Sequence, residues 1–587
     1  MPAAEGQAAI PTGSGLATVH GVVRNAATGE PLARALVRIE GDAENGALTD
    51  GSGRFEIPGV PVGQQTFEVI KPGFLENMFA TTGAGNGVEQ FLVAMATGGH
   101  NVLVAAEMPD LNFALAPTGS IQGQVVLSTG DPAQGIGIQL VRRTVQDGRG
   151  IWQAAGQTKT NSEGSYRFAG LAGGIYAIYT DPAMEGEGGT ALVAGNRGAA
   201  ARSGYASVFY PDAREESSAG RIRVRGGEQA QANLTLTLEP FYLVTALAAL
   251  PQSSRLSAAD RESTSYTALV MDSGGHTLGY PARFDAQTHT IQALLPDGTY
   301  SLLISTVPRM TRQRLQFRSM DGNPLEATVN LPDEDTGPML GTVDFSVAGQ
   351  PVANLRVPLS APQPNAMQLN LLESETGTAA GSQGAKSPTG GWIDAGLTVV
   401  MVSLAGGWID DGMVRAYASG RGAGSMQAVY TTPGSYWVHA RAQKGFCEAS
   451  FTAGGANLAR EPLVIGISGS TAPMELTVRN DCSRLTVSLP ESLSSLGPGE
   501  EPFYTVYVIP EFDSTADVEP MTLRASTGGS FTLDDLTPGN YRVYMFDAPV
   551  QLEYRNPSAL AALPNVGQEV TLSPGVTGNV VLEAAGR

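Results

Sequence analysis

Cysteine, charge and long hydrophobic runs are all scarce in this chain of 587 residues. Charged residues make up 16% of it, against about 25% of an average soluble protein. No apolar run approaches the roughly 20 residues of a membrane-spanning helix, so no membrane span is expected. The first residues, MPAAEGQAAIPTGSG, have neither a basic nor an apolar segment, and the sequence therefore shows no signal peptide.

Positive charge is in short supply as well. The net charge is −20, with 36 Lys and Arg against 56 Asp and Glu. Binding to the phosphates of nucleic acid needs clustered Lys and Arg, so nucleic acid is excluded as a partner. The same balance argues against an anionic membrane surface.

Two cysteines are present, Cys447 and Cys482. Without a CxxC pair or a Cys/His cluster, a thiolate zinc site is excluded. Two interpretations stay open: a disulfide in an oxidising compartment, or two unrelated buried thiols. The disulfide is favoured because the rest of the chain looks extracytoplasmic. It would stabilise the fold by about 4 kcal/mol in the chain-entropy description.

Catalytic motifs are missing too. None of the five histidines has Glu three residues later, and neither a G-x-S-x-G turn nor a phosphate-binding GxxxxGK[ST] loop occurs. The acidic segments DEDTG (333–337) and Asp534-Asp535 lack the spacing of a calcium loop, and Asp50 is more simply an Asx-turn residue. We therefore expect no enzyme activity, no cofactor and no metal site.

Glycine and proline, by contrast, are plentiful, with 73 and 37 residues. They punctuate a repeat that reads aromatic-x-apolar-x-x-Leu-x-x-Gly-x-Tyr-x-apolar. Its alternation predicts a strand, a short bridge and a second strand. We interpret its tyrosines Tyr176, Tyr300, Tyr436 and Tyr541 as core or corner residues. The copies are SYRFAGLAGGIYAIY (165–179) and SFTLDDLTPGNYRVY (530–544), with weaker ones at 54–69, 290–304 and 429–440.

A second pattern, an alternation interrupted by a glycine turn, closes each interval of about one hundred residues. The two patterns agree in order and number, which predicts five modules after an N-terminal tail (1–14). Their expected bounds are 15–117, 118–240, 241–360, 361–479 and 480–587. No window has a sustained helical period, so an all-β chain is expected. The short joints, often a single Pro, favour a semi-rigid rod.

The first module resembles the carboxypeptidase regulatory-like domain. The resemblance rests on Gly21-Val22-Val23, on Pro31, Leu32, Ala35 and Val37, and on the turn with Thr49, Asp50, Gly53 and Phe55. Residues 119–171 are a second copy, with Asn161 in place of the Asp. The resemblance implies a tandem array of about five Ig-like or transthyretin-like β-sandwich modules without catalysis. The multi-module arrangement is similar to that of the surface or secreted proteins of Acidobacteria-type bacteria.

A short duplication stands out in the fourth module. GGWIDAG (390–396) and GGWIDDG (406–412) each place a Trp between two glycines and Ile-Asp. Trp392 and Trp408 could stack on sugar rings, with Asp394 and Asp410 accepting hydroxyl hydrogen bonds. The alternative is that these are two hairpin ends whose tryptophans pack in the core, as buried aromatics in sandwiches commonly do.

These observations favour a secreted or cell-surface structural protein. An adhesin, a surface-layer or filament subunit, or a spacer would each fit, with the chain itself or other surface proteins as partners through exposed strand edges. A carbohydrate-binding protein is the alternative, with glycans as partners. An undetected hydrolase comes last.

Overall fold

The computed structural model describes residues 15–42, 46–76, 100–105, 108–185, 201–214, 218–249, 266–272, 277–285, 287–306, 310–318, 324–332, 340–359, 369–373, 398–403, 413–417, 434–441, 445–465, 474–490, 503–516, 518–524, 529–546 and 550–582. Strands dominate, and the only α-helix in these ranges is α4 (Pro557–Ala561). The all-β class predicted from the alternation is confirmed.

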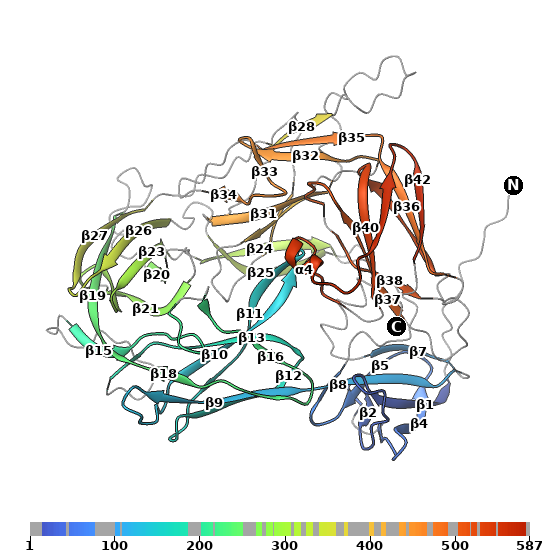
Figure 1. Ribbon diagram of the computed structural model, residues 1–587, viewed down its shortest axis with the longest axis horizontal. Coiled ribbons are helices and arrows are strands. Elements are labelled where there is room, and N and C mark those ends of the chain that lie inside the picture. The colour runs from blue at the N-terminus through green and yellow to red at the C-terminus, as the bar shows by residue number, and fades with distance from the viewer. Residues whose placement is uncertain are drawn as a thin grey trace.

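The strands form a series of modules that runs from blue to red in Figure 1. Module one has two four-stranded sheets, in the orders β4-β1-β8-β6 and β3-β2-β5-β7. Its strands are β1 (Leu16–Asn25), β2 (Leu36–Ile39), β3 (Gly46–Leu48), β4 (Arg54–Pro61), β5 (Gly63–Ile70), β6 (Phe74–Glu76), β7 (His100–Val104) and β8 (Leu111–Pro117).

Module two repeats this plan, with sheets β11-β10-β13-β16 and β12-β9-β17, and with β18 also on β9. Its strands are β9 (Gly119–Leu127), β10 (Gly137–Gln146), β11 (Arg149–Lys159), β12 (Ser165–Leu171), β13 (Gly174–Thr180), β14 (Ala183–Met184), β15 (Ala201–Tyr205), β16 (Ile222–Val224), β17 (Gln229–Gln231) and β18 (Leu234–Leu236).

Module three is joined to module two by a shared strand. β19 pairs with β15 through residues 238–242 and with β22 through residues 242–247, so it runs straight through the expected boundary at 240. The strands are β19 (Leu238–Ala249), β20 (Tyr266–Met271), β21 (Thr277–Asp285), β22 (Thr290–Leu295), β23 (Gly298–Thr306), β24 (Met310–Arg318), β25 (Pro324–Pro332), β26 (Leu340–Val347) and β27 (Val352–Pro358).

Module four again has two sheets, β28-β35-β32-β33 and β30-β29-β31-β34. Its strands are β28 (Leu369–Glu373), β29 (Thr398–Ser403), β30 (Met413–Tyr417), β31 (Gly434–Arg441), β32 (Cys447–Ala453), β33 (Ala456–Asn457), β34 (Leu463–Ile465) and β35 (Met474–Arg479).

Module five packs β39-β36-β42 against β38-β37-β40-β41. Asn556 caps the short helix α4 by accepting a hydrogen bond from the backbone N–H of Ala559, and Pro557 begins it. The strands are β36 (Ser483–Ser488), β37 (Phe503–Pro510), β38 (Met521–Arg524), β39 (Ser530–Leu536), β40 (Gly539–Phe546), β41 (Gln568–Leu572) and β42 (Thr577–Val581).

One topological feature recurs five times. The first strand of each module pairs in parallel with its last, whereas the other pairings are antiparallel. The parallel pairs are β1 with β8, β9 with β17 and β18, β19 with β27, β28 with β35, and β36 with β42. A parallel partner cannot be reached by a tight turn, so each pair closes a whole module.

The repeated sequence unit crosses between sheets. In modules one, two and five its two strands, β4 and β5, β12 and β13, and β39 and β40, belong to different sheets. The tyrosine hydroxyls of Tyr176, Tyr300 and Tyr541 each donate to the carbonyl four residues earlier, at 2.7, 3.0 and 2.7 Å. These corners confirm the interpretation of the three tyrosines, and Tyr436 is likewise buried.

The turn of the family resemblance has the expected form. The Asp50 carboxylate accepts from the backbone N–H groups of Ser52 and Arg54, at 2.8 and 2.9 Å. Asn161 does the same for Glu163 and Ser165, at 3.0 and 2.8 Å. Asp50 is therefore an Asx-turn residue, as its sequence predicts.

The modules do not form a straight rod. The chain curves, and the hairpin β10–β11 points into the middle of the molecule, where its tip contacts modules four and five (Figure 1). The expected semi-rigid rod is therefore wrong. A short joint restricts the local angle between neighbouring modules, but it does not make successive angles add up to a line.

Candidate functional site

The tip of the β10–β11 hairpin is a two-residue turn, Asp147-Gly148. Both residues have positive φ, 50° and 65°. The type I′ turn requires this at both central positions, and Asp-Gly is among the pairs that adopt it most readily. The local sequence thus carries Asp147 past the end of the sheet of module two.

Asp147 is buried among groups that come from three modules. Its Oδ2 lies 2.8 Å from Nε2 of His439 on β31 and also pairs with Arg149. Its Oδ1 accepts from the Tyr554 hydroxyl at 3.1 Å and from Nε of Arg555 at 3.2 Å. Only 7% of the Asp147 side chain and 5% of the His439 side chain are exposed.

The charge of Asp147 is therefore held by its partners. Burial by itself raises the pKa of this carboxyl, but the His439 contact and the positive charges of Arg555 and Arg149 outweigh it. The pKa of Asp147 consequently lies below its usual value, and the group stays ionised at neutral pH.

Gly148 and Arg149 complete the tip. The Gly148 carbonyl accepts a 3.0 Å hydrogen bond from the backbone N–H of Arg555. The Arg149 guanidinium lies 3.5 Å from the ring centre of Trp437, a cation–π contact with module four. Burial, together with the nearby charge of Arg555, lowers the pKa of Arg149 to about 10, so it remains a cation.

A second ion pair reinforces the contact with module five. Arg143 donates from Nε and Nη2 to the two oxygens of Glu553, at 2.8 and 2.7 Å. A bidentate ion pair of this kind fixes the relative orientation of the two side chains as well as the distance between them. Burial opposes the charge of Glu553, but the hydrogen bonds from Arg143 and Asn556 lower the pKa of Glu553 overall.

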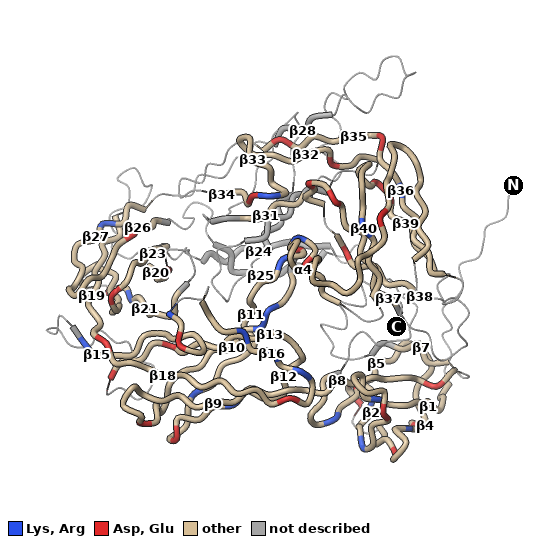
Figure 2. The backbone as a smooth tube through the Cα atoms, in the orientation of Figure 1, with Lys and Arg blue, Asp and Glu red and all other residues tan. Residues whose placement is uncertain are grey.

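We call these contacts the interlock. It comprises Arg143 and residues 147–149 of module two, Trp437 and His439 of module four, and residues 553–555 of module five. Figure 2 shows basic residues along β11 and next to α4, in the middle of the molecule where these parts meet. The chain has few charged residues, and several of them are gathered in the interlock.

Modules four and five form the other half of the interlock together. Nδ1 of His439 lies 2.6 Å from the carbonyl oxygen of Thr515. The buried carboxylate of Glu448 accepts from the Thr515 backbone N–H at 3.0 Å and from its hydroxyl at 2.6 Å. Burial raises the pKa of Glu448, against these hydrogen bonds.

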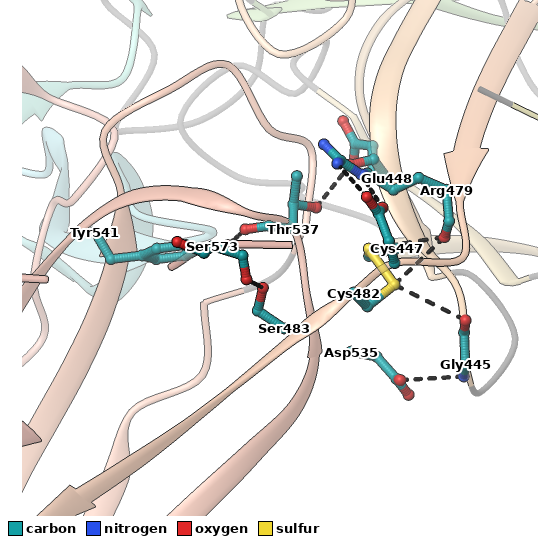
Figure 3. Close-up of a disulfide and its surroundings, with 11 residues drawn as sticks. Gly445, Cys447, Glu448, Arg479, Cys482, Ser483, Asp535, Thr537, Tyr541 and Ser573 are labelled. Atoms are coloured by element: carbon teal, nitrogen blue, oxygen red, sulfur yellow. Dashed lines mark hydrogen bonds and ion pairs between the residues drawn. A yellow bond between two sulfur atoms is a disulfide. The ribbon is translucent and has the colours of Figure 1, made fainter. Parts of the chain in front are cut away.

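The joint between modules four and five also contains the two cysteines. Cys447 at the start of β32 and Cys482 just before β36 form a disulfide, with Cα atoms 5.8 Å apart (Figure 3). Beside it, the Thr537 hydroxyl donates to the Glu448 carbonyl at 2.6 Å, and the Gly445 N–H donates to Asp535 at 3.1 Å. These links fix module five relative to module four, so the hairpin tip meets a defined surface.

The residues singled out from the sequence fare differently. The cysteines lie at the joint that supports the interlock. Trp392, Asp394, Trp408 and Asp410 lie outside the described residues. The sequence reasoning missed the interlock, although Asp147-Gly148 between two alternating runs is a strong hairpin signal.

Within the described ranges, no three His, Cys, Asp or Glu side chains gather as metal ligands would. The helices of these ranges include none that is long and apolar enough to cross a membrane.

A family model described as the carboxypeptidase regulatory-like domain matches residues 18–95. The matched segment lies within module one, where the turn with Asp50 carries the resemblance. No curated protein matches the sequence.

Several solved structures are similar to this chain at low identity. The Bacillus anthracis TIE protein is 12% identical, over 80% of this chain and 76% of that one, with a TM-score of 0.16. The minor pilin GBS52 of Streptococcus agalactiae is 15% identical, over 38% and 95%, with a TM-score of 0.17. A streptococcal ancillary pilin is 12% identical, over 58% and 99%, with a TM-score of 0.17. Such low TM-scores say nothing about how the modules of this chain are arranged or what it does.

Proposed function

We propose that this protein is a non-catalytic structural protein of the cell surface or extracellular space. It acts as an adhesin or as a subunit of a filament or surface layer. Its five modules, with the bounds 15–117, 118–240, 241–360, 361–479 and 480–587, are held in one closed arrangement. The interlock is the observation that carries this proposal.

The use of charge supports a structural role. The side chains of Asp147 and His439 are buried, and those of Arg149 and Arg555 are largely buried. Asp147 pairs across module borders with His439 of module four and with Arg555 of module five. A catalytic acid or base must instead reach a substrate. The hydrogen bonds and ion pairs of these groups instead hold the modules together.

The disulfide supports an extracytoplasmic location. Disulfides persist in oxidising compartments and are rare in the cytosol. This one lies at the joint of modules four and five, where it restrains the surface that receives the hairpin.

Scattering from the full chain in solution tests the closed arrangement. A compact chain of this length has a radius of gyration of about 25 Å. Five modules placed end to end, each roughly 33 Å long, would have one of about 50 Å. We expect a value well below that of the linear array, and the linear value would contradict the proposal.

Negative-stain images and size-exclusion chromatography at rising concentration then test assembly. Filaments or discrete oligomers support the role of a surface subunit. Turnover in a hydrolase screen would instead rank an enzyme first.

Glycan binding is the second candidate, and the duplicated GGWID segments favour it. A tryptophan ring can stack on a sugar ring, and a neighbouring carboxylate can accept hydrogen bonds from sugar hydroxyls. On this hypothesis the native chain binds glycans on an array, and the Trp392→Ala, Trp408→Ala double variant loses that binding. If the native chain binds no glycan, the hypothesis is refuted.

A further inference from the structure

His439 has an acceptor at each of its ring nitrogens. Nδ1 lies 2.6 Å from the Thr515 carbonyl oxygen, which can only accept, so Nδ1 carries a proton. Nε2 lies 2.8 Å from an oxygen of the Asp147 carboxylate. That distance is short enough for an ion pair, and the Asp147 carboxylate is held in its charged form by its other partners.

A neutral imidazole does not suit this site. It has one N–H, which Nδ1 must keep for Thr515, and Nε2 would then present a lone pair to the Asp147 carboxylate. Two sets of lone pairs at 2.8 Å repel each other in a place from which water is largely excluded. The imidazolium form donates on one side and offers its charge on the other, so the closed interlock binds the protonated ring.

Other charged groups face the same pair from each neighbouring element. Asp147 also meets Arg149 on β11 and Arg555 before α4. Tyr554 reaches it with its hydroxyl, and Glu448 on β32 lies across Thr515 from the ring. The pKa of Arg149 is about 10 and the pKa of Asp147 lies below its usual value, so both groups are charged at neutral pH. Histidine is the side chain that ordinarily changes charge between about pH 5 and 8.

We propose that the interlock is a proton-controlled latch, closed while His439 is protonated and weakened when the ring loses its proton. The hairpin tip then separates from modules four and five, while each module keeps its own fold. The contribution of His439 is present at low pH and is lost as the pH rises. This inference rests on the proposed role of the interlock in holding the modules together.

Hydrogen–deuterium exchange of the full chain tests the latch, because one amide reports on it directly. The Arg555 N–H bonds the Gly148 carbonyl across the module border. After correction for the intrinsic effect of pH, we expect its protection factor to fall at least tenfold between pH 5.5 and 8.5. The amide of Val141 within module two should keep its protection.

The possible outcomes separate the two proposals. Equal protection of Arg555 at both pH values overturns the latch but leaves the closed arrangement standing. An Arg555 amide that is unprotected at both values overturns the closed arrangement itself, and the latch with it.

Two variants identify the titrating group. In His439→Gln the tenfold difference should vanish, with protection at the wild-type pH 8.5 level throughout. The exposed histidine of β1 provides the matched control, and His20→Gln should keep the full difference. Asp147→Asn, which removes the charge that selects the imidazolium, should also abolish the difference. Unchanged protection in β40 shows that each variant is folded, and a persisting difference in His439→Gln would overturn the assignment.

Discussion

The ion pair between Arg143 and Glu553 offers a quantitative test of the interlock. Its two hydrogen bonds measure 2.8 and 2.7 Å, and the two side chains are 19% and 16% exposed. Exposed pairs contribute about 0–1 kcal/mol, whereas removing one partner of a fully buried pair costs about 3–5 kcal/mol. This pair lies between those limits, so Arg143→Ala should cost closure about 2 kcal/mol.

That cost corresponds to a loss of about 30-fold in the ratio of closed to open molecules. The protection of the Arg555 amide measures the ratio, and Glu553→Ala should lower it to a similar extent. In the double variant the losses should be less than additive, because both single variants remove the same pair. Arg38→Ala, which breaks an ion pair inside module one, is the control and should leave Arg555 unchanged. Fully additive losses, or none in Arg143→Ala, would refute the reasoning.

Three further predictions concern the same joint. In Gly148→Ala the new Cβ would stand 2.6 Å from the Tyr554 ring, on a residue whose φ is 65°, so hydrogen–deuterium exchange at the Arg555 amide should show the interlock open. The control is Gly130→Ala, where φ is 92° and nothing lies within 4 Å of the new Cβ, so the substitution should strain only its own turn. Because the pKa of Asp147 is lowered, its contribution to the stability of the closed form is complete above about pH 4 and is lost as the pH falls further. Scattering should therefore show the chain opening below about pH 4 and not at pH 5. The disulfide joins two residues that are 35 apart in the sequence, so its reduction should lower the free energy of unfolding by up to about 4 kcal/mol. The amides of β32 should then lose protection against hydrogen exchange, while those of β1 should stay unchanged.

The repeated corners show how much of the fold the sequence contains. Tyr176, Tyr300 and Tyr541 recur at one place in a local pattern, and each makes the same bond to the carbonyl four residues before it. Thr49 and Thr160 are a further matched pair, each accepting from a backbone N–H and donating to a carbonyl in the core. Alternation and turn chemistry act over short stretches, so a single sequence suffices to predict them.

The interlock could not be predicted in the same way. Asp147-Gly148 predicts a hairpin tip, but its partners Tyr554 and Arg555 are 407 and 408 residues away along the chain. Which tip meets which surface depends on the angles at every joint between them. One of those joints is the continuous strand β19, which runs through Pro240 although a proline usually marks a break in the chain. The composition did hold one clue, a group of arginines around residues 142–149 in a chain of low charge.

The chemistry of the interlock suits a contact that opens and closes. Apolar surfaces joined this closely would be exposed on opening and would favour aggregation. The arginines, Asp147 and Glu553 can each be hydrated when the hairpin leaves, so the open form stays soluble. Ion pairs add specificity more than affinity, and the type I′ turn presents Asp147 in one fixed direction. A rigid hairpin with charged contacts therefore gives these modules a defined relative position without joining them permanently, while the disulfide supplies the permanent link at the neighbouring joint.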